Sequence, residues 1–80
     1  MEKKVLVPHL NTSKKKGILV AWVKEEGQEV KEGDILYEIE VEKVIRQVEA
    51  ESCGFLTALL VEEGDEVVEG QQVAIIEIEG

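Results

Sequence analysis

The sequence predicts an all-β fold, a flattened β-barrel or sandwich of two antiparallel sheets with internal pseudo-two-fold symmetry. Three observations predict it. Shifted by 37 positions, the chain aligns with itself, so that residues 17–42 match residues 54–79 and half of the 26 aligned positions are identical. The apolar residues are mainly Val, Ile and Leu, which favour strands. No segment of ten or more residues has the i, i+3, i+4 apolar stripe of a helix without a glycine inside it.

Each repeat unit indicates a strand, a turn, a short strand, a second turn and a closing strand. Glycines at positions 27, 33, 64 and 70 provide the positive φ angles of tight turns and bracket short strands around Val30 and Val67. The closing strand of the first unit has one wet face, because Ile35, Tyr37, Ile39 and Val41 alternate with Leu36, Glu38, Glu40 and Glu42. A unit of 26 residues cannot cover its own apolar face, so two units should pack together.

The segments outside the repeat complete the expected fold. Residues 3–7 should add a strand, His9 to Lys16 should form a polar surface loop, and residues 44–51 also have the pattern of a strand. The chain must therefore reverse near Lys43. A two-residue turn at Glu42-Lys43 would keep apolar side chains on one face by pairing Val41 with Val44, Tyr37 with Val48 and Ile35 with Ala50.

The turn at Glu42-Lys43 lacks the residues that usually form such turns, since it has no Gly, Asn, Asp or Pro. A turn made of residues that seldom form turns, within an otherwise regular strand pattern, is typical of a functional position. Lys43 is therefore the main candidate, and a solvated surface lysine is the alternative. The carboxylates of Glu40 and Glu42 favour its charged ammonium form, so we expect an outside enzyme to be needed to acylate it.

Composition excludes several classes of protein. The net charge is −9, with +4 on residues 1–16 and −13 on the rest, which argues against nucleic-acid binding. No apolar run is long enough for a membrane span, and the first residues lack the apolar stretch of a signal peptide, so we expect a cytoplasmic protein. Cys53 is the only cysteine, so we expect a small buried thiol, with neither a disulfide nor a metal site built on paired cysteines.

Several motifs resemble those of the biotinyl/lipoyl attachment domains, most closely the lipoyl domain of a 2-oxo acid dehydrogenase dihydrolipoamide acyltransferase. They include Val5-Leu6-Val7-Pro8, Gly17 to Trp22, Gly33-Asp34, Glu40-Val41-Glu42-Lys43-Val44 and Glu63-Gly64-Asp65. The resemblance implies that Lys43 is the site of lipoyl attachment. It also implies that the attaching ligase reads Gly27, Glu40 and Gly54, with Glu42 beside the lysine, and that the two glycines shape the hairpin. Glu42 and Val44 stand where biotinyl domains have Met, which favours lipoate over biotin.

The resemblance implies a carrier domain without catalytic residues. Lipoate on Lys43 would act as a swinging arm that shuttles acyl groups and reducing equivalents within a 2-oxo acid dehydrogenase complex. The implied partners are a lipoate-attaching ligase or transferase, a thiamin-dependent 2-oxo acid decarboxylase, an acyltransferase core and dihydrolipoamide dehydrogenase. We expect Lys14, Lys15 and Lys16 to contribute to partner docking.

Two alternatives remain open at this stage. One is a biotinyl carrier domain of a carboxylase or decarboxylase, and the other is an unmodified lipoyl-like adaptor module. We expect residues 1–80 to form one monomeric domain from the N-terminal part of a longer acyltransferase, although a free-standing carrier is the alternative.

Overall fold

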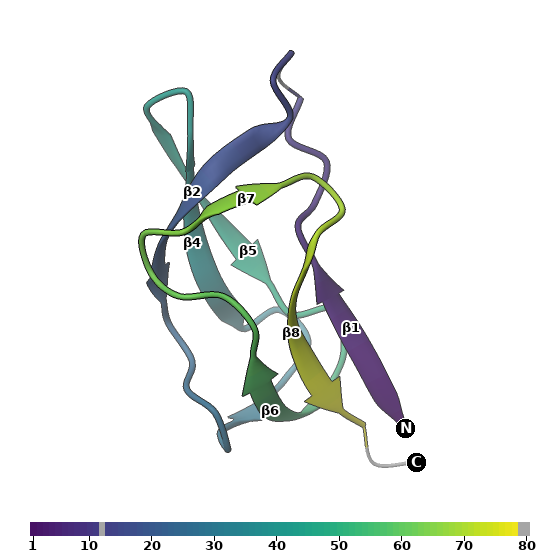
Figure 1. Ribbon diagram of the computed structural model, residues 1–80. Helices are drawn as coiled ribbons and strands as arrows, with labels where there is room; N and C mark the ends of the chain where they lie inside the picture. The colour runs from purple at the N-terminus through teal and green to yellow at the C-terminus, as the bar shows by residue number, and fades with distance from the viewer. Residues whose placement is uncertain (12, 79–80) are drawn as a thin grey trace.

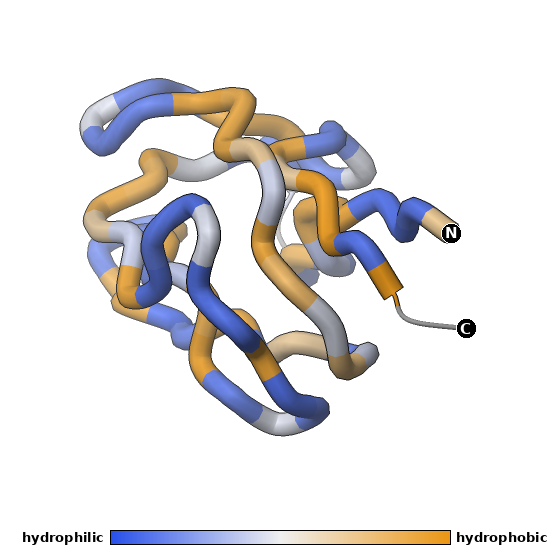
Figure 2. The backbone as a smooth tube through the Cα atoms, turned by 90° about the horizontal axis from the view of Figure 1, so that it is seen from below, coloured by the Kyte–Doolittle hydropathy of each residue, from blue (hydrophilic) through white to orange (hydrophobic). Residues whose placement is uncertain are grey.

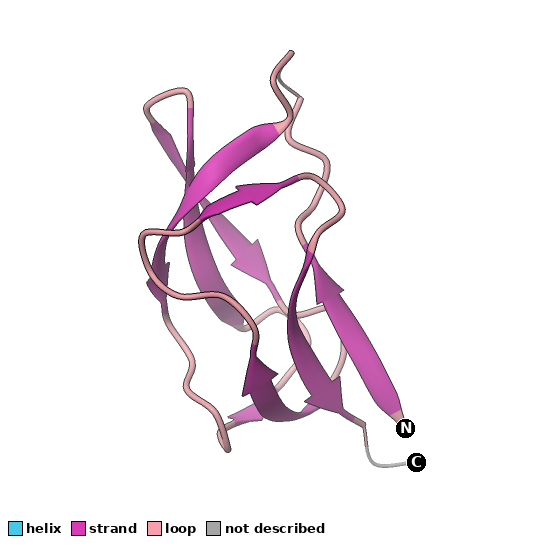
Figure 3. Cartoon of the chain, viewed as in Figure 1, coloured by secondary structure: helices cyan, strands magenta, loops and turns pink. Residues whose placement is uncertain are grey.

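The computed structural model describes residues 1–11 and 13–78, and these residues form eight strands and no helix (Figures 1 and 3). The strands are β1 (Glu2–Leu6), β2 (Lys16–Trp22), β3 (Glu29–Val30), β4 (Ile35–Val41), β5 (Val44–Glu49), β6 (Gly54–Leu59), β7 (Glu66–Val68) and β8 (Gln72–Glu77). The all-β prediction is confirmed. With no helix among these residues, the described chain contains no helical membrane span.

Two antiparallel four-stranded sheets make up the fold, in the orders β1-β8-β6-β3 and β5-β4-β2-β7. Each sheet takes strands from both repeat units, because β3 of the first unit pairs with β6 of the second, and β7 of the second unit pairs with β2 of the first. Neither sheet closes into a barrel, so the structure is a flattened sandwich. This arrangement confirms that the two units cover each other.

The repeat is preserved down to backbone details. A β-bulge lies between Leu19 and Ala21 in the first unit and between Leu56 and Ala58 in the second. The turn glycines are equivalent as well: Gly27 has φ +88° and donates to Leu56, while Gly64 has φ +94° and donates to Leu19. Because these features recur in the two units, they belong to the scaffold and not to one functional site.

The core is an aliphatic cluster with one fully buried aromatic ring, Tyr37. The buried residues are Val5, Val7, Leu10, Leu19, Val30, Leu36, Tyr37, Ile39, Val41, Ala50, Leu56, Val67, Val73, Ala74 and Ile76. In Figure 2 several chain reversals are hydrophilic and the strands between them are largely hydrophobic. The expected polar loop from His9 to Lys16 therefore has an apolar base, since Leu10 is buried in this core.

Three details of the sequence interpretation were wrong. Ile35 pairs with Glu49 and not with Ala50, because a bulge between Ile35 and Tyr37 changes the register. The bulge also explains why Leu36 is buried instead of sharing the wet face of β4. Cys53, expected to be buried, is exposed, and its sulfur accepts a long hydrogen bond of 3.5 Å from the Glu32 N–H.

Candidate functional site at the tip of the β4–β5 hairpin

Lys43 lies in the two-residue turn that joins β4 to β5, as the sequence predicted. Val41 and Val44 pair on either side of the turn, and Tyr37 pairs with Val48 further down the hairpin, both in the predicted register. Figure 1 shows this turn at the opposite end of the molecule from the two chain termini. The fold therefore presents Lys43 at a tip that is open to large partners.

The turn has an unusual backbone conformation for its residues. Glu42 has φ +50° and Lys43 has φ +68°, so both central residues are in the left-handed region. This is the geometry of the type I′ turns that suit hairpins, which normally use Asn or Gly because other L-residues resist positive φ. Strained backbone of this kind clusters at functional sites. The turn thus keeps two residues that its own geometry disfavours.

The Lys43 side chain is exposed and makes no hydrogen bond or ion pair with any residue in the described part of the chain. Glu42, next to it, is also exposed. Glu42 is the only other side chain in the turn, and it makes no contact with the Lys43 amine among the described residues. The arrangement is suited to offering the amine to another protein.

Gly17 on β2 allows the hairpin to lie close to the rest of its sheet. A Cβ added at Gly17 would lie 2.6 Å from the backbone oxygen of Glu40 and 3.0 Å from a methyl carbon of Val41. These residues form the last part of β4 before the turn. Gly17 therefore supports the base of the hairpin, and its alignment with Gly54 in the repeat was the signal that could have revealed this role.

The structure does not bring Gly27 or Gly54 to the hairpin. Gly54 pairs with Val30 in the other sheet, and Gly27 donates to the carbonyl of Leu56 in the same region. A Cβ at Gly54 would lie 2.2 Å from the backbone oxygen of Glu77, so its contact is with β8. Gly27 and Gly54 therefore shape the distant part of the fold, and Gly17 takes the place at the hairpin that was expected of them.

The loop between β1 and β2 is tied down at its base by two charged side chains that the sequence interpretation missed. Glu69 accepts a hydrogen bond of 2.9 Å from the Leu10 N–H, and its carboxylate lies 3.1 Å from His9 Nδ1. The hydrogen bond from the Leu10 N–H is the main cause that lowers the pKa of Glu69 below its ordinary value, and the charges of His9 and Lys15 lower it further. From β5, Arg46 donates to the carbonyls of His9 and Leu10.

These contacts place the lysine-rich part of the loop at the same end of the molecule as the hairpin, as Figure 1 shows. Lys14, Lys15 and Lys16 are all exposed. Lys16, however, begins β2 and forms an ion pair of 3.6 Å with Glu66 on β7. The three lysines thus share one region, but part of their charge is already balanced within the chain.

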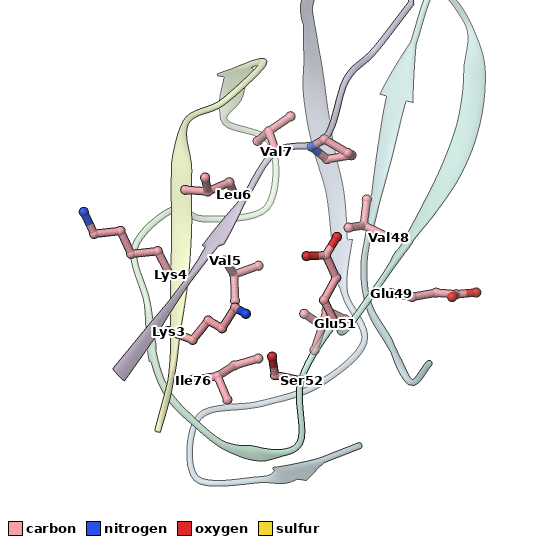
Figure 4. A pocket seen from close by; sticks show the side chains of 12 residues that line it. Lys3, Lys4, Val5, Leu6, Val7, Val48, Glu49, Glu51, Ser52 and Ile76 are labelled. Carbon is pink, nitrogen blue, oxygen red and sulfur yellow. The ribbon is translucent and has the colours of Figure 1, made fainter. Parts of the chain in front are cut away.

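A cavity of about 380 Å³ lies between β1 and β5, which are edge strands of the two sheets (Figure 4). Val5 and Val48 line opposite sides of it, and Lys3 and Glu51 are also among its lining residues. Lys43 is not among its lining residues. The cavity follows from the gap between two sheets that do not close into a barrel, and it is separate from the hairpin tip.

Comparison with known proteins identifies the family. A family model described as "Biotin-requiring enzyme", the biotin and lipoyl attachment model, matches residues 3–76. Among curated proteins, the chain is 40% identical over 50 residues to the pyruvate dehydrogenase E1 component subunit beta of Rhizobium meliloti, covering 62% of this chain and 11% of that protein. It is 40% identical over 47 residues to the dihydrolipoyllysine-residue acetyltransferase component of the pyruvate dehydrogenase complex of Rickettsia typhi, covering 59% of this chain and 12% of that protein.

Solved structures show the same fold. The lipoyl domain of the 2-oxoglutarate dehydrogenase complex from Azotobacter vinelandii has a TM-score of 0.78 and 28% identity, covering 96% of this chain and 98% of that one. Urea carboxylase from Kluyveromyces lactis has a TM-score of 0.82 and 26% identity, covering 96% of this chain and 6% of the carboxylase. The chain thus has the fold of a carrier domain, and it belongs to the family of biotin and lipoyl attachment domains.

Proposed function

We propose that Lys43 carries lipoate in amide linkage and that the chain is a swinging-arm carrier of a 2-oxo acid dehydrogenase complex. The observation that carries this proposal is the exposed, unpartnered Lys43 at the tip of a turn with positive φ at both central residues. Support also comes from the relatives, since the two curated proteins described above are components of pyruvate dehydrogenase.

The residues around Lys43 fit an attached group of this kind. The amine projects from a narrow tip, so a group joined to it meets solvent and partner proteins instead of the core. The ladder between β4 and β5 and the close approach at Gly17 hold the base of the tip in place. When bound, lipoate supplies a dithiolane that can carry an acyl group and a pair of electrons. The contribution of the chain is to present and tether it.

Tethering explains why a small rigid domain is useful here. A group held at a fixed tip meets successive active sites at a high effective concentration without new binding contacts. The proposed partners are a lipoate-attaching ligase, a thiamin-dependent decarboxylase, an acyltransferase core and dihydrolipoamide dehydrogenase. Exposed Lys14 and Lys15, at the same end as Lys43, would steer docking and so affect the association rate more than the strength of binding.

A biotin carrier is the second candidate, and a specific observation favours it. The urea carboxylase structure superimposes on this chain with a TM-score of 0.82, as well as the lipoyl domain does. Against biotin, Glu42 and Val44 flank the lysine in place of the two Met residues that the family resemblance associates with biotinyl domains. The likeness of folds therefore leaves the choice of cofactor to experiment.

Expression of the chain with each attaching enzyme separates the two candidates. We expect intact mass spectrometry to show an increment for lipoate after expression with a lipoate ligase, and none after expression with a biotin ligase. The Lys43→Arg variant should show neither increment. An increment for biotin alone would overturn the proposal, and an unmodified chain with both enzymes would indicate an adaptor module.

A further inference from the structure

The cavity between β1 and β5 has a mainly apolar lining. Val5 and Val48 line it from the two edge strands, while Leu36 and Ile76 reach it from the inner strands β4 and β8. Its volume of about 380 Å³ is in the range of pockets that bind small organic molecules. Such pockets combine an apolar lining with a few polar groups that fix the orientation of the ligand.

Lys3 and Glu51 are the charged side chains directed at this cavity. Lys3 shares the inner face of β1 with Val5, because side chains two residues apart along a strand point the same way. In Figure 4 Lys3 and Glu51 are turned toward the space between the two strands, and Lys4 and Glu49 extend away from it. Neither the Lys3 nor the Glu51 side chain forms an ion pair or hydrogen bond with the described residues. The cavity therefore offers one free ammonium group and one free carboxylate.

The other end of the same two strands is built differently. Arg46 of β5 is equivalent to Lys3 of β1, since the two occupy equivalent positions in the ladders with β4 and β8. Arg46 spans the two edges, because it donates to the carbonyl of Leu10 at 3.3 Å. Lys3 makes no such bond among the described residues, and Glu51 has Pro8 as its equivalent, so its carboxylate has no counterpart. Bridged at one end, the space between the strands keeps its free charges at the other.

We propose that this cavity binds a free α-amino acid with an aliphatic side chain. The ammonium group of Lys3 donates to the carboxylate of the ligand, and the carboxylate of Glu51 accepts from its ammonium group. The aliphatic side chain packs against Val48 and Leu36, which removes apolar surface from water. Lys43 takes no part in this site, so the inference is independent of the proposed function.

Charge complementarity selects a zwitterion with an apolar body. An aliphatic acid without an amine would leave Glu51 unpaired beside a second carboxylate, and an aliphatic amine would leave Lys3 unpaired beside a second ammonium group. Glycine has both charges but would leave the apolar lining in contact with water. Because Lys3 and Glu51 are also exposed to solvent, each ion pair contributes modestly, and we expect binding in the millimolar range.

The test is a titration of the isotope-labelled 80-residue chain with L-leucine, followed by amide NMR spectra. We expect the amide signals of Val5, Val48 and Ser52, all of which line the cavity, to shift and to saturate. Isocaproate and isopentylamine keep the aliphatic body of leucine and remove one charge each. Both should bind more weakly by about fivefold or more, as should glycine.

Lys3→Gln and Glu51→Gln should each raise the dissociation constant for leucine by about fivefold. Lys4→Gln and Glu49→Gln change the neighbouring charges that extend away from the cavity and serve as matched controls, with values within about twofold of the unchanged chain. Unchanged amide signals outside the cavity would show that each variant keeps its fold.

Three results would overturn the proposal. They are the absence of a saturable shift with leucine, equal binding of the uncharged N-acetyl-leucinamide, and equal losses in all four variants. Each would leave the attachment of lipoate to Lys43 untouched, because the titration uses the unmodified chain and intact mass measures the modification separately.

Discussion

The lysine end of the molecule and the opposite end are built from equivalent strands but finish differently. At the lysine end, β4 and β5 are joined by the strained turn at Glu42 and Lys43. At the opposite end, the equivalent strands β8 and β1 come together through a hydrogen bond of 2.7 Å from Ile78 to Met1. Glycines, bulges and turn hydrogen bonds recur in the two units, whereas two consecutive non-glycine residues with positive φ occur once among the described residues, at Glu42 and Lys43. Features that occur in both repeat units are therefore required by the fold, whereas the turn that occurs only at the lysine end is the candidate for a specific function.

The largest loss of stability should come from replacing the two strand glycines, Gly17 and Gly54, with Ala, because no space is left for a Cβ at either position. In Gly54→Ala the new Cβ would lie 2.2 Å from the Glu77 oxygen, and in Gly17→Ala it would lie 2.6 Å from the Glu40 oxygen. Overpacking against backbone should cost about 3 kcal/mol for Gly54→Ala and about 2 kcal/mol for Gly17→Ala in the free energy of unfolding. Urea denaturation measures both losses.

The same pair of variants tests whether the ends are independent. Amide NMR shifts should change around the Lys43 hairpin in Gly17→Ala and around β8 in Gly54→Ala. A variant as stable as the unchanged chain, or shifts at the wrong end, would mean that the two glycines do not support the strands next to them.

Tyr37 distinguishes the cores of the two units, because the repeat places Ala74 at the equivalent position. Its ring packs on Trp22 with centroids 5.1 Å apart, and its buried hydroxyl has no hydrogen-bond partner among the described residues. Tyr37→Phe removes an unsatisfied polar group, so it should raise the free energy of unfolding by about 1 kcal/mol. Thermal and urea unfolding would show this, and a loss of more than about 1 kcal/mol would indicate a hidden partner for the hydroxyl.

The alkaline stability of the chain should also depend on Tyr37. Burial raises the pKa of its hydroxyl from 10.0 to about 12. Between these values the unfolded chain loses the proton while the folded chain keeps it, so stability present below pH 10 falls as the pH rises to about 12. The loss should be on the order of 2 kcal/mol in the original chain and absent in Tyr37→Phe. Equal losses in the two proteins would contradict the assignment.

The strained turn should respond to a residue that tolerates its geometry. Asn adopts positive φ more readily than Glu, so Glu42→Asn should raise stability by about 1 kcal/mol and the melting temperature by about 5 °C. Differential scanning calorimetry measures the change. Replacement of Gln47 by Asn in the β5 strand is a suitable control, and it should not be stabilising. A lower melting temperature for Glu42→Asn would show that the turn is not strained at this residue.

The smallest effect is expected at Lys24, whose equivalent in the second unit is Val61. Its amine lies 3.7 Å from Asp34 and its side chain is 22% exposed. Lys24→Met should change stability by less than about 1 kcal/mol, because such a pair contributes little and the alkyl stem is replaced by a similar one. Unfolding at low and high salt would reveal any larger ionic contribution as a marked difference between the two conditions.

Much of the scaffold was predictable because the repeat is explicit in the sequence. The equivalence of residues 17–42 and 54–79 predicted the strands, the turn glycines and the position of Lys43 between the units. The predicted pairing of β4 with β5 was wrong beyond Tyr37, because a bulge between Ile35 and Tyr37 shifts the register. This bulge buries Leu36 against the other sheet, and the alternation of apolar and polar residues does not reveal it. The burial of Leu10 could not be predicted either, because it is a single apolar residue in a polar stretch of the sequence.

The surroundings of Lys43 were harder to predict than Lys43 itself. The contacts of Glu69 and Arg46 with the β1–β2 loop join residues about 36 to 60 positions apart. Such contacts have no local sequence pattern. The role of Gly17 at the hairpin could have been predicted from the sequence, because Gly54, its equivalent in the second repeat unit, was already a candidate site residue.

Peptide mapping would show which lysine carries the lipoyl group. The chain is acylated by a lipoate ligase and digested, and the peptides are sequenced by mass spectrometry, alongside Lys43→Arg and the control Lys31→Arg. We expect one lipoyl group, on Lys43, which is lost in Lys43→Arg and kept in Lys31→Arg. A lipoyl group on any other lysine, or its persistence in Lys43→Arg, would contradict the assignment of this turn as the attachment site.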